Sequence, residues 1–83
     1  MNDCQRLVDM KTGDQGTVSA LLGGKGFRRR LEAMGVRRGV AIEKVASSPF
    51  GGPVIVRIGH VRLAIGYGMG TRIIVAAKLT DIR

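Results

Sequence analysis

Residue types that build metal sites and covalent cross-links are almost missing from this sequence. It contains one cysteine, Cys4, and one histidine, His60. A lone cysteine excludes a disulfide within the chain, and one cysteine with one histidine is too small a set of soft ligands for a zinc or iron site. We therefore expect no tight metal site within one chain and no resident cofactor, with His60 a solvated turn residue.

Long apolar runs are also missing. No run approaches the roughly 18 residues that a membrane-spanning helix requires. Residues 1–5 lack the basic start and the apolar stretch of a signal peptide. We expect a cytoplasmic protein with no membrane span. At 83 residues it should form one domain over 1–83, with a core over about 7–77 and modest stability.

Acidic and aromatic residues are scarce. The 14 lysines and arginines outnumber the 6 acidic residues, which gives a net charge of +8. Such a charge favours an anionic partner: nucleic acid, anionic lipid or an acidic protein surface. Binding to single-stranded nucleic acid stacks bases on aromatic side chains, but Phe27, Phe50 and Tyr67 are widely spread. We expect no specific nucleic-acid partner, and a basic nucleic-acid-binding module remains the alternative.

The sequence shows no set of groups that would carry out catalysis. It has no nucleophile–base pair, and a glycine-rich stretch at 23–26 misses the phosphate-loop pattern because Ser19 and Gly26 stand at its first and last positions. The carboxylates are scattered along the chain, among them Asp9, Asp14, Glu32, Glu43 and Asp81. We therefore predict that the protein is not an enzyme.

One stretch, residues 21–36, has an apolar period near 3.6. Phe27, Leu31 and Met34 are spaced i, i+4 and i+7, so they share one face of a helix of about three turns. Gly35 stands where a helix ends by taking a positive φ, which costs glycine nothing sterically. We predict that this is the sole helix and that its apolar face packs on a sheet.

The rest of the chain favours short strands. Alternating apolar residues and turn signals predict strands at 15–21, 40–47, 54–58, 61–65 and 72–77. Residues 7–14 are expected to form a lead-in and turn, 66–71 one tight helical turn, and 78–83 a tail. In the second strand Ile42 and Val45 fall on opposite faces unless a β-bulge intervenes. The prediction is a mainly β fold: a small, partly open β-barrel of about five strands, with one short α-helix between the first and second strands.

The alternation also predicts the core. The side chains that we expect to be mostly buried are Val18, Phe27, Leu31, Met34, Ile42, Val54, Val56, Leu63, Ile65, Ile73 and Val75.

Two motifs in this arrangement resemble a known family. The helix end Leu31-x-x-x-Gly35-Val36 and the loop at 49–53, Pro-x-Gly-Gly-Pro, are similar to those of ferrous-iron transport protein A, FeoA. The resemblance runs from about residue 7 to 75 and implies an SH3-like barrel. It also implies an accessory role, as adaptor or regulator, beside a membrane ferrous-iron permease with its own GTP-binding domain. The regulatory module of iron-dependent repressors shares that fold and is a further alternative.

The chain departs from the family pattern at two places. Arg38 stands where the family often has proline, and the glycine-rich residues 66–70 replace a segment that is usually more basic. The second departure leaves the role of this segment in any interaction open.

A protein partner needs an exposed surface, and the basic side of the helix is our candidate. Arg28, Arg29 and Arg30 span too much of the helix circumference to be buried together, and Arg37 and Arg38 follow Gly35. They form either a merely solvated face or one positive surface that binds a partner. Phe50, at the tip of the loop, is the other candidate, although we expect it to pack over the barrel mouth. Weak homo-oligomers are a further option.

Overall fold

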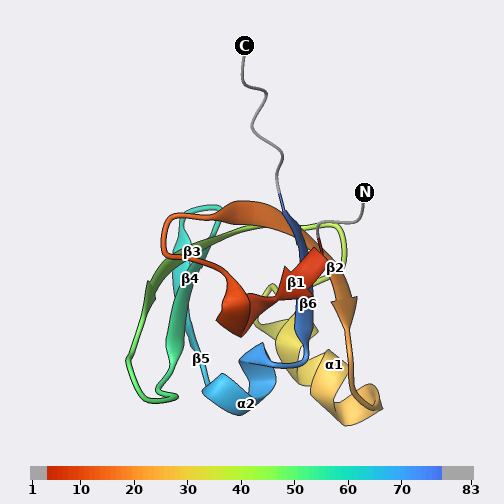
Figure 1. The fold of residues 1–83 in the computed structure, drawn as a ribbon. Coiled ribbons are helices and arrows are strands. Elements are labelled where there is room, and N and C mark those ends of the chain that lie inside the picture. The colour runs from red at the N-terminus through yellow and green to blue at the C-terminus, as the bar shows by residue number, and fades with distance from the viewer. Residues whose placement is uncertain (1–3, 78–83) are drawn as a thin grey trace.

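The protein folds as one curled antiparallel sheet with a helix across one side (Figure 1). The structure is a computed structural model and describes residues 4–77. Six strands follow the order β1-β6-β2-β3-β4-β5, so β1 and β5 are the edges and the barrel is not closed. The strands are β1 (Cys4–Arg6), β2 (Gln15–Leu21), β3 (Ala41–Ser47), β4 (Val54–Ile58), β5 (Val61–Ile65) and β6 (Ile73–Ala77).

The predicted helix is confirmed as α1 (Lys25–Ala33). It ends as expected, because Gly35 takes a φ of 96° and the Val36 N–H donates to the Leu31 carbonyl at 2.9 Å. The tight turn expected at 66–71 is α2 (Tyr67–Gly70). The lead-in contains one further turn, the 3-10 helix η1 (Leu7–Asp9).

The first strand, β1, was not predicted. It has three residues and pairs with β6 through Cys4↔Ala76, Gln5↔Val75 and Arg6↔Ile74. Three residues are too few to show an alternation of their own, and the strand exists because the edge of β6 is available to it. The expectation of about five strands is therefore short by one. The tail expected at 78–83 lies outside the described residues.

The second strand contains a bulge, which its imperfect alternation had left open. The pairing of β3 with β4 shifts register between Lys44 and Ala46. Before that shift, Ile42 and Lys44 both point to the inner face and are both buried. We did not expect this alternation to place a lysine, Lys44, inside the barrel.

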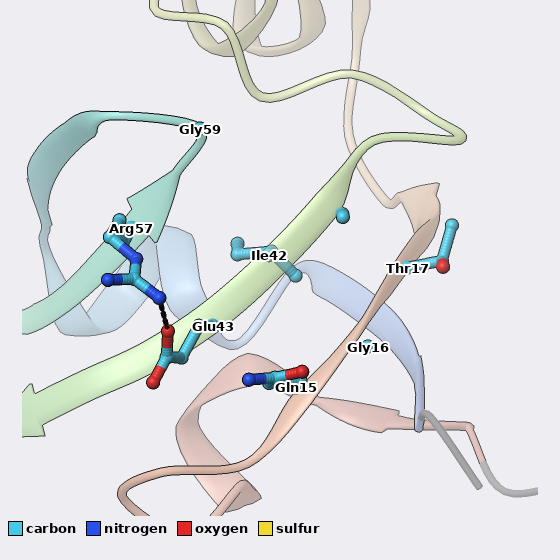
Figure 2. A pocket seen from close by; sticks show the side chains of 8 residues that line it. Gln15, Gly16, Thr17, Ile42, Glu43, Arg57 and Gly59 are labelled. Atoms are coloured by element: carbon cyan, nitrogen blue, oxygen red, sulfur yellow. Dashed lines mark hydrogen bonds and ion pairs between the residues drawn. The ribbon is translucent and has the colours of Figure 1, made fainter.

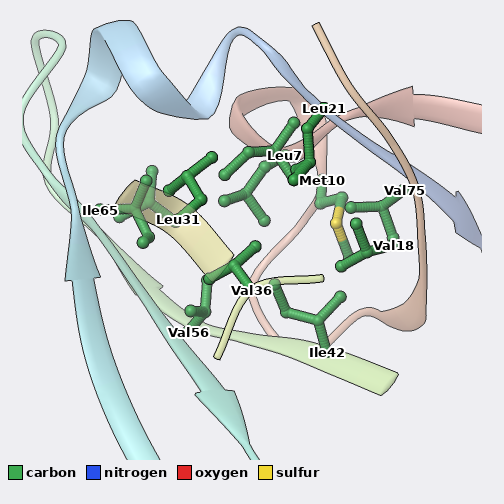
Figure 3. Close-up of a cluster of buried hydrophobic side chains, with 12 residues drawn as sticks. Leu7, Met10, Val18, Leu21, Leu31, Val36, Ile42, Val56, Ile65 and Val75 are labelled. Carbon is green, nitrogen blue, oxygen red and sulfur yellow. The ribbon is translucent and has the colours of Figure 1, made fainter. Parts of the chain in front are cut away.

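The core fills the space between the sheet, η1 and α1 (Figure 3). Most of the predicted core residues are buried, but Phe27, Met34 and Leu63 are only half-buried. Their side chains lie at the margin of the core, where they pack against it from outside. The core also takes in four residues that were not predicted: Leu7, Met10, Leu21 and Val36.

Candidate functional site

The arginines of α1 lie on different sides of the helix. Because Leu31 points fully inward, Arg28 and Arg30 fall on opposite flanks and Arg29 points away from the core. Arg28 lies on the side of β2, in a groove of about 570 Å³ that we call the β2 groove. The residues that line the β2 groove are Ser19, Ala20, Leu21, Arg28, Glu32 and Arg38.

A second groove lies on the other flank of the helix, between α1 and α2. This α2 groove has a volume of about 440 Å³ and is lined by Gly26, Phe27, Arg30, Gly68, Met69 and Arg72. The guanidinium carbon of Arg72 lies 5.6 Å from the centre of the Phe27 ring, a cation–π distance. The groove therefore offers an apolar floor with two cations beside it.

Some of the arginines expected to form one positive surface line two different grooves. Arg28 and Arg38 both line the β2 groove, whereas Arg30 lines the α2 groove with Arg72. Arg37 bends back, and its Nε donates to the Glu32 carbonyl at 3.5 Å. Arg72 was not among the predicted residues, and no local sequence signal connects it to α1; only the pairing of β6 with β2 does so.

We expected Phe50 to pack over the barrel mouth, but its side chain is fully exposed. It has a φ of 63°, and the next residue, Gly51, has a φ of 77°. A positive φ is unusual for a bulky residue, and this turn directs the ring away from the sheet. The Ser48 N–H donates to the Pro53 carbonyl at 3.2 Å and closes the loop.

A third groove lies across the outer faces of β2, β3 and β4 (Figure 2). It has a volume of about 460 Å³, and its lining includes Gln15, Thr17, Glu43 and Arg57. The Arg57 guanidinium and the Glu43 carboxylate form an ion pair with each other. This groove therefore presents little net charge to a partner.

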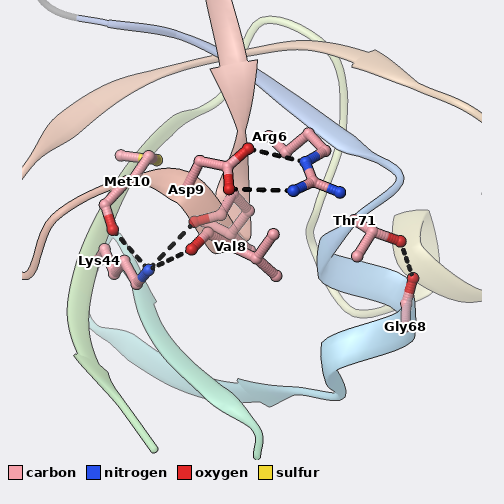
Figure 4. Close-up of polar contacts among 8 residues, drawn as sticks. Arg6, Val8, Asp9, Met10, Lys44, Gly68 and Thr71 are labelled. Carbon is pink, nitrogen blue, oxygen red and sulfur yellow. Dashed lines mark hydrogen bonds and ion pairs between the residues drawn. The ribbon is translucent and has the colours of Figure 1, made fainter. Parts of the chain in front are cut away.

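The buried lysine of β3 is held by main-chain oxygens (Figure 4). Lys44 is 2% exposed, and its Nζ donates to the carbonyls of Leu7, Val8 and Met10 at 3.3, 3.1 and 2.6 Å. Burial lowers the pKa of Lys44, and the charge of Asp9 opposes that shift. The ammonium has three hydrogens for three acceptors, so its role in this structure is to fix η1 to the sheet. Its position two residues after Ile42 was the only sequence signal that it faces inward.

The Asp9 carboxylate lies beside the same segment. It accepts hydrogen bonds from Arg6 Nε at 2.7 Å and from Arg6 Nη2 at 3.0 Å. The hydrogen bond from Arg6 holds the pKa of Asp9 below its usual value.

Comparison with known proteins agrees with this fold and with the two sequence motifs. Residues 5–77 match the family described as the FeoA domain. The chain belongs to the FeoA family. It is 39% identical to a solved iron uptake regulatory protein (FeoA), with a TM-score of 0.84 over 90% of this chain and 99% of that one.

Two other solved structures show how far this fold extends. The FeoA of Stenotrophomonas maltophilia, solved with zinc and described as a prokaryotic SH3 domain protein, is 25% identical, with a TM-score of 0.68 over 86% of this chain and 88% of that one. A manganese-dependent transcriptional repressor is 20% identical, with a TM-score of 0.85 over 94% of this chain and 44% of its own, which shows the fold alone. The expected SH3-like fold is confirmed. No curated protein matches the chain.

The described residues of this FeoA protein do not bring three or more metal-binding side chains together. Cys4 is exposed on β1 with its Sγ 3.8 Å from Ser19 Oγ, and His60 is exposed in the β4–β5 turn. Our expectation that one chain holds no tight iron site stays a prediction. Within residues 4–77, no helix is long and apolar enough to cross a bilayer.

Proposed function

We propose that this FeoA protein is a non-catalytic accessory factor of ferrous-iron uptake. In this proposal it acts in the cytoplasm as an adaptor or regulator of a membrane ferrous-iron permease that has a GTP-binding domain. The observation that carries the proposal is the match of residues 5–77 to the FeoA domain. Two relatives support it: one is called an iron uptake regulatory protein, and the other is described as a candidate activating factor of ferrous-iron transport.

The proposed contact surface is the basic side of α1. The partner-binding residues remain Arg28, Arg29, Arg30, Arg37, Arg38 and Phe50, and the pair that we expect to matter most is Arg28 with Arg38. Both line the β2 groove, so a carboxylate entering the groove would meet two guanidinium groups. Glu32 lines the same groove and would repel a carboxylate at the wrong position, which adds selectivity.

The test measures binding to the cytoplasmic GTP-binding domain of the permease by calorimetry. The double variant Arg28→Glu/Arg38→Glu should bind at least about tenfold more weakly, since it replaces attraction by repulsion. The matched control is Lys11→Glu/Arg62→Glu, which makes the same change of net charge at exposed residues outside the β2 groove and the α2 groove. The control should stay within about threefold of the unmodified protein, and both variants should keep its melting temperature.

Regulation of the permease needs a second readout. We expect the rate of GTP hydrolysis by the permease domain to change on addition of the unmodified protein and of the control, but not of Arg28→Glu/Arg38→Glu. Undiminished binding by this double variant would remove the β2 groove from the proposal. Absence of binding by the unmodified protein would remove the adaptor role.

The charge of +8 favours a second candidate, nucleic-acid binding. Of the three aromatic rings, Phe27 is half-buried beneath Arg72, which leaves Phe50 and Tyr67 for stacking. Filter binding to mixed-sequence DNA at about 0.15 M salt separates the two functions. Retention at nanomolar protein would support the nucleic-acid function, and feeble retention would support the adaptor.

A further inference from the structure

Three connections leave the sheet at the same end. The pair Val54↔Ile65 places the β3–β4 loop beside the entry to α2, and the pair Leu21↔Ile73 places the β2–α1 turn beside the exit from it. Figure 1 shows the β3–β4 loop, α2 and the start of α1 along its lower side. We call residues 22–30, 48–53 and 66–72 together the loop end.

The loop end carries most of the exposed apolar bulk of the described chain. Four large apolar residues between 4 and 77 are strongly exposed, and three of them, Leu22, Phe50 and Tyr67, belong to the loop end. Each comes from a different connection, and none of them lines a groove described above. The fourth, Val61, lies beside the β4–β5 turn. The loop end therefore offers three separate apolar tips beside the α2 groove.

The same end carries charge of one sign. Its segments contain five cations, namely Lys25, Arg28, Arg29, Arg30 and Arg72, and no carboxylate. The guanidinium of Arg28 folds back toward the start of α1, where its Nη1 donates to the Gly23 carbonyl at 3.3 Å. The Leu22 N–H donates to the Arg72 carbonyl at 2.8 Å, which holds the two segments together.

We propose that the loop end is a membrane-docking surface that binds an anionic lipid bilayer. Separate apolar tips can each enter the headgroup region, whereas a protein partner would need a pocket for each of them. Basic side chains around the tips would meet acidic headgroups, and tyrosine is well suited to the boundary because one end of its side chain is polar. Apolar insertion and charge are each weak signals alone, and stable attachment needs two such signals together.

This docking does not rest on the proposed function, because it needs no permease. It assigns Phe50 and Arg29 to the lipid instead of the permease, and it leaves the β2 groove with Arg28 and Arg38 for a protein partner. It would orient the molecule with α2 and the start of α1 toward the lipid and the β4–β5 turn away from it. A protein attached in this way would search for a membrane partner in two dimensions, with its β2 side accessible from the aqueous phase.

The first experiment sediments the full chain with vesicles of phosphatidylcholine alone or with about one quarter phosphatidylglycerol. At about 0.1 M salt we expect at least about tenfold stronger partitioning onto the anionic vesicles, falling as salt is raised to about 0.5 M. Equal partitioning onto the two kinds of vesicle would overturn the proposal.

Matched variants test which end binds. Phe50→Ser/Arg29→Glu removes one exposed apolar side chain and reverses one exposed arginine at the loop end, and Val61→Ser/Arg62→Glu makes the same changes on β5. We expect at least about tenfold loss for the first and less than about twofold for the second, with thermal melts showing that both are folded. Equal losses would mean attraction by net charge alone and would overturn the assignment to the loop end.

A fluorescent variant tests insertion of the tip directly. The chain has no tryptophan, so Phe50→Trp introduces a unique probe at a fully exposed position without removing apolar bulk. Its emission should shift to the blue on anionic vesicles and stay unchanged on neutral ones. An emission that shifts only when the permease domain is added would show that the loop end is a protein interface, and it would overturn the lipid proposal.

Discussion

The ammonium of Lys44 lies 2.6 Å from the carbonyl oxygen of Met10, across a separation of 34 residues in the chain. This contact ties β3 to the segment that contains η1. In turn η1 supports α2, because a methyl group built on Gly70 would lie 2.8 Å from the Val8 side chain. The buried Lys44 therefore holds the segment against which α2 packs at the loop end.

Replacing Lys44 by methionine should destabilise the protein by about 2–4 kcal/mol, because two buried carbonyls and one partly buried carbonyl lose their donor while the apolar bulk is kept. Urea denaturation measures this cost. The control Lys11→Met, at an exposed position, should change the free energy of unfolding by less than about 0.5 kcal/mol. A methionine variant as stable as the unmodified protein would show that the ammonium is dispensable.

The ion pair of Asp9 with Arg6 should make stability depend on acid pH. The pKa of Asp9 is held below its usual value of 3.8 in the folded protein, so the unfolded chain takes up a proton first as the pH falls. The pair therefore stabilises the protein fully above the unfolded-state pKa, and this stabilisation is lost as the pH falls through the lower folded-state pKa. The excess stability of the unmodified protein over Asp9→Asn should shrink in that range. If the difference in stability between the unmodified protein and Asp9→Asn stays constant from pH 6 to pH 2, this prediction is wrong.

The elements with a local pattern were predictable from the sequence. Helix α1 was visible in the spacing of Phe27, Leu31 and Met34, and the β4–β5 hairpin in clean alternation around Gly59. The conflict in the alternation of β3 pointed to a bulge there without deciding it. In each case a few neighbouring residues carry the whole signal.

What the sequence could not reveal depends on segments that are distant in the chain. The short strand β1 forms only because β6 offers it an edge, and Lys44 is satisfied by carbonyls of a segment about 35 residues earlier. The α2 groove beside α1 has the same origin, since the pairing of β6 with β2 places Arg72 in the same groove as Arg30. The exposure of Phe50 depends on the backbone conformation of its loop, which the composition of residues 48–53 left open.

Two glycines should respond to alanine in opposite ways. A Cβ on Gly16 would collide with the Ala76 carbonyl oxygen across the β2–β6 pairing, and a collision with backbone cannot be relieved by a side-chain rotation. We expect Gly16→Ala to cost about 1–3 kcal/mol. Gly26 in α1 has open space around its Cβ position, so Gly26→Ala should stabilise by about 0.5–1 kcal/mol. Thermal melts of both variants measure the difference, and a loss of stability in both would contradict the helical geometry at Gly26.

The three apolar residues of α1 should differ in what they contribute. The sequence placed Phe27, Leu31 and Met34 on one face as equals, but in the structure Leu31 is fully buried and Met34 only half-buried. Leu31→Ala should cost about 2–5 kcal/mol, because it removes buried methyl groups and leaves a cavity. Met34→Ala should cost only about 1–2 kcal/mol, because part of that side chain is already in water. Guanidinium denaturation of both variants measures the two costs, and a larger loss for Met34→Ala would show that α1 is rotated about its axis relative to this structure.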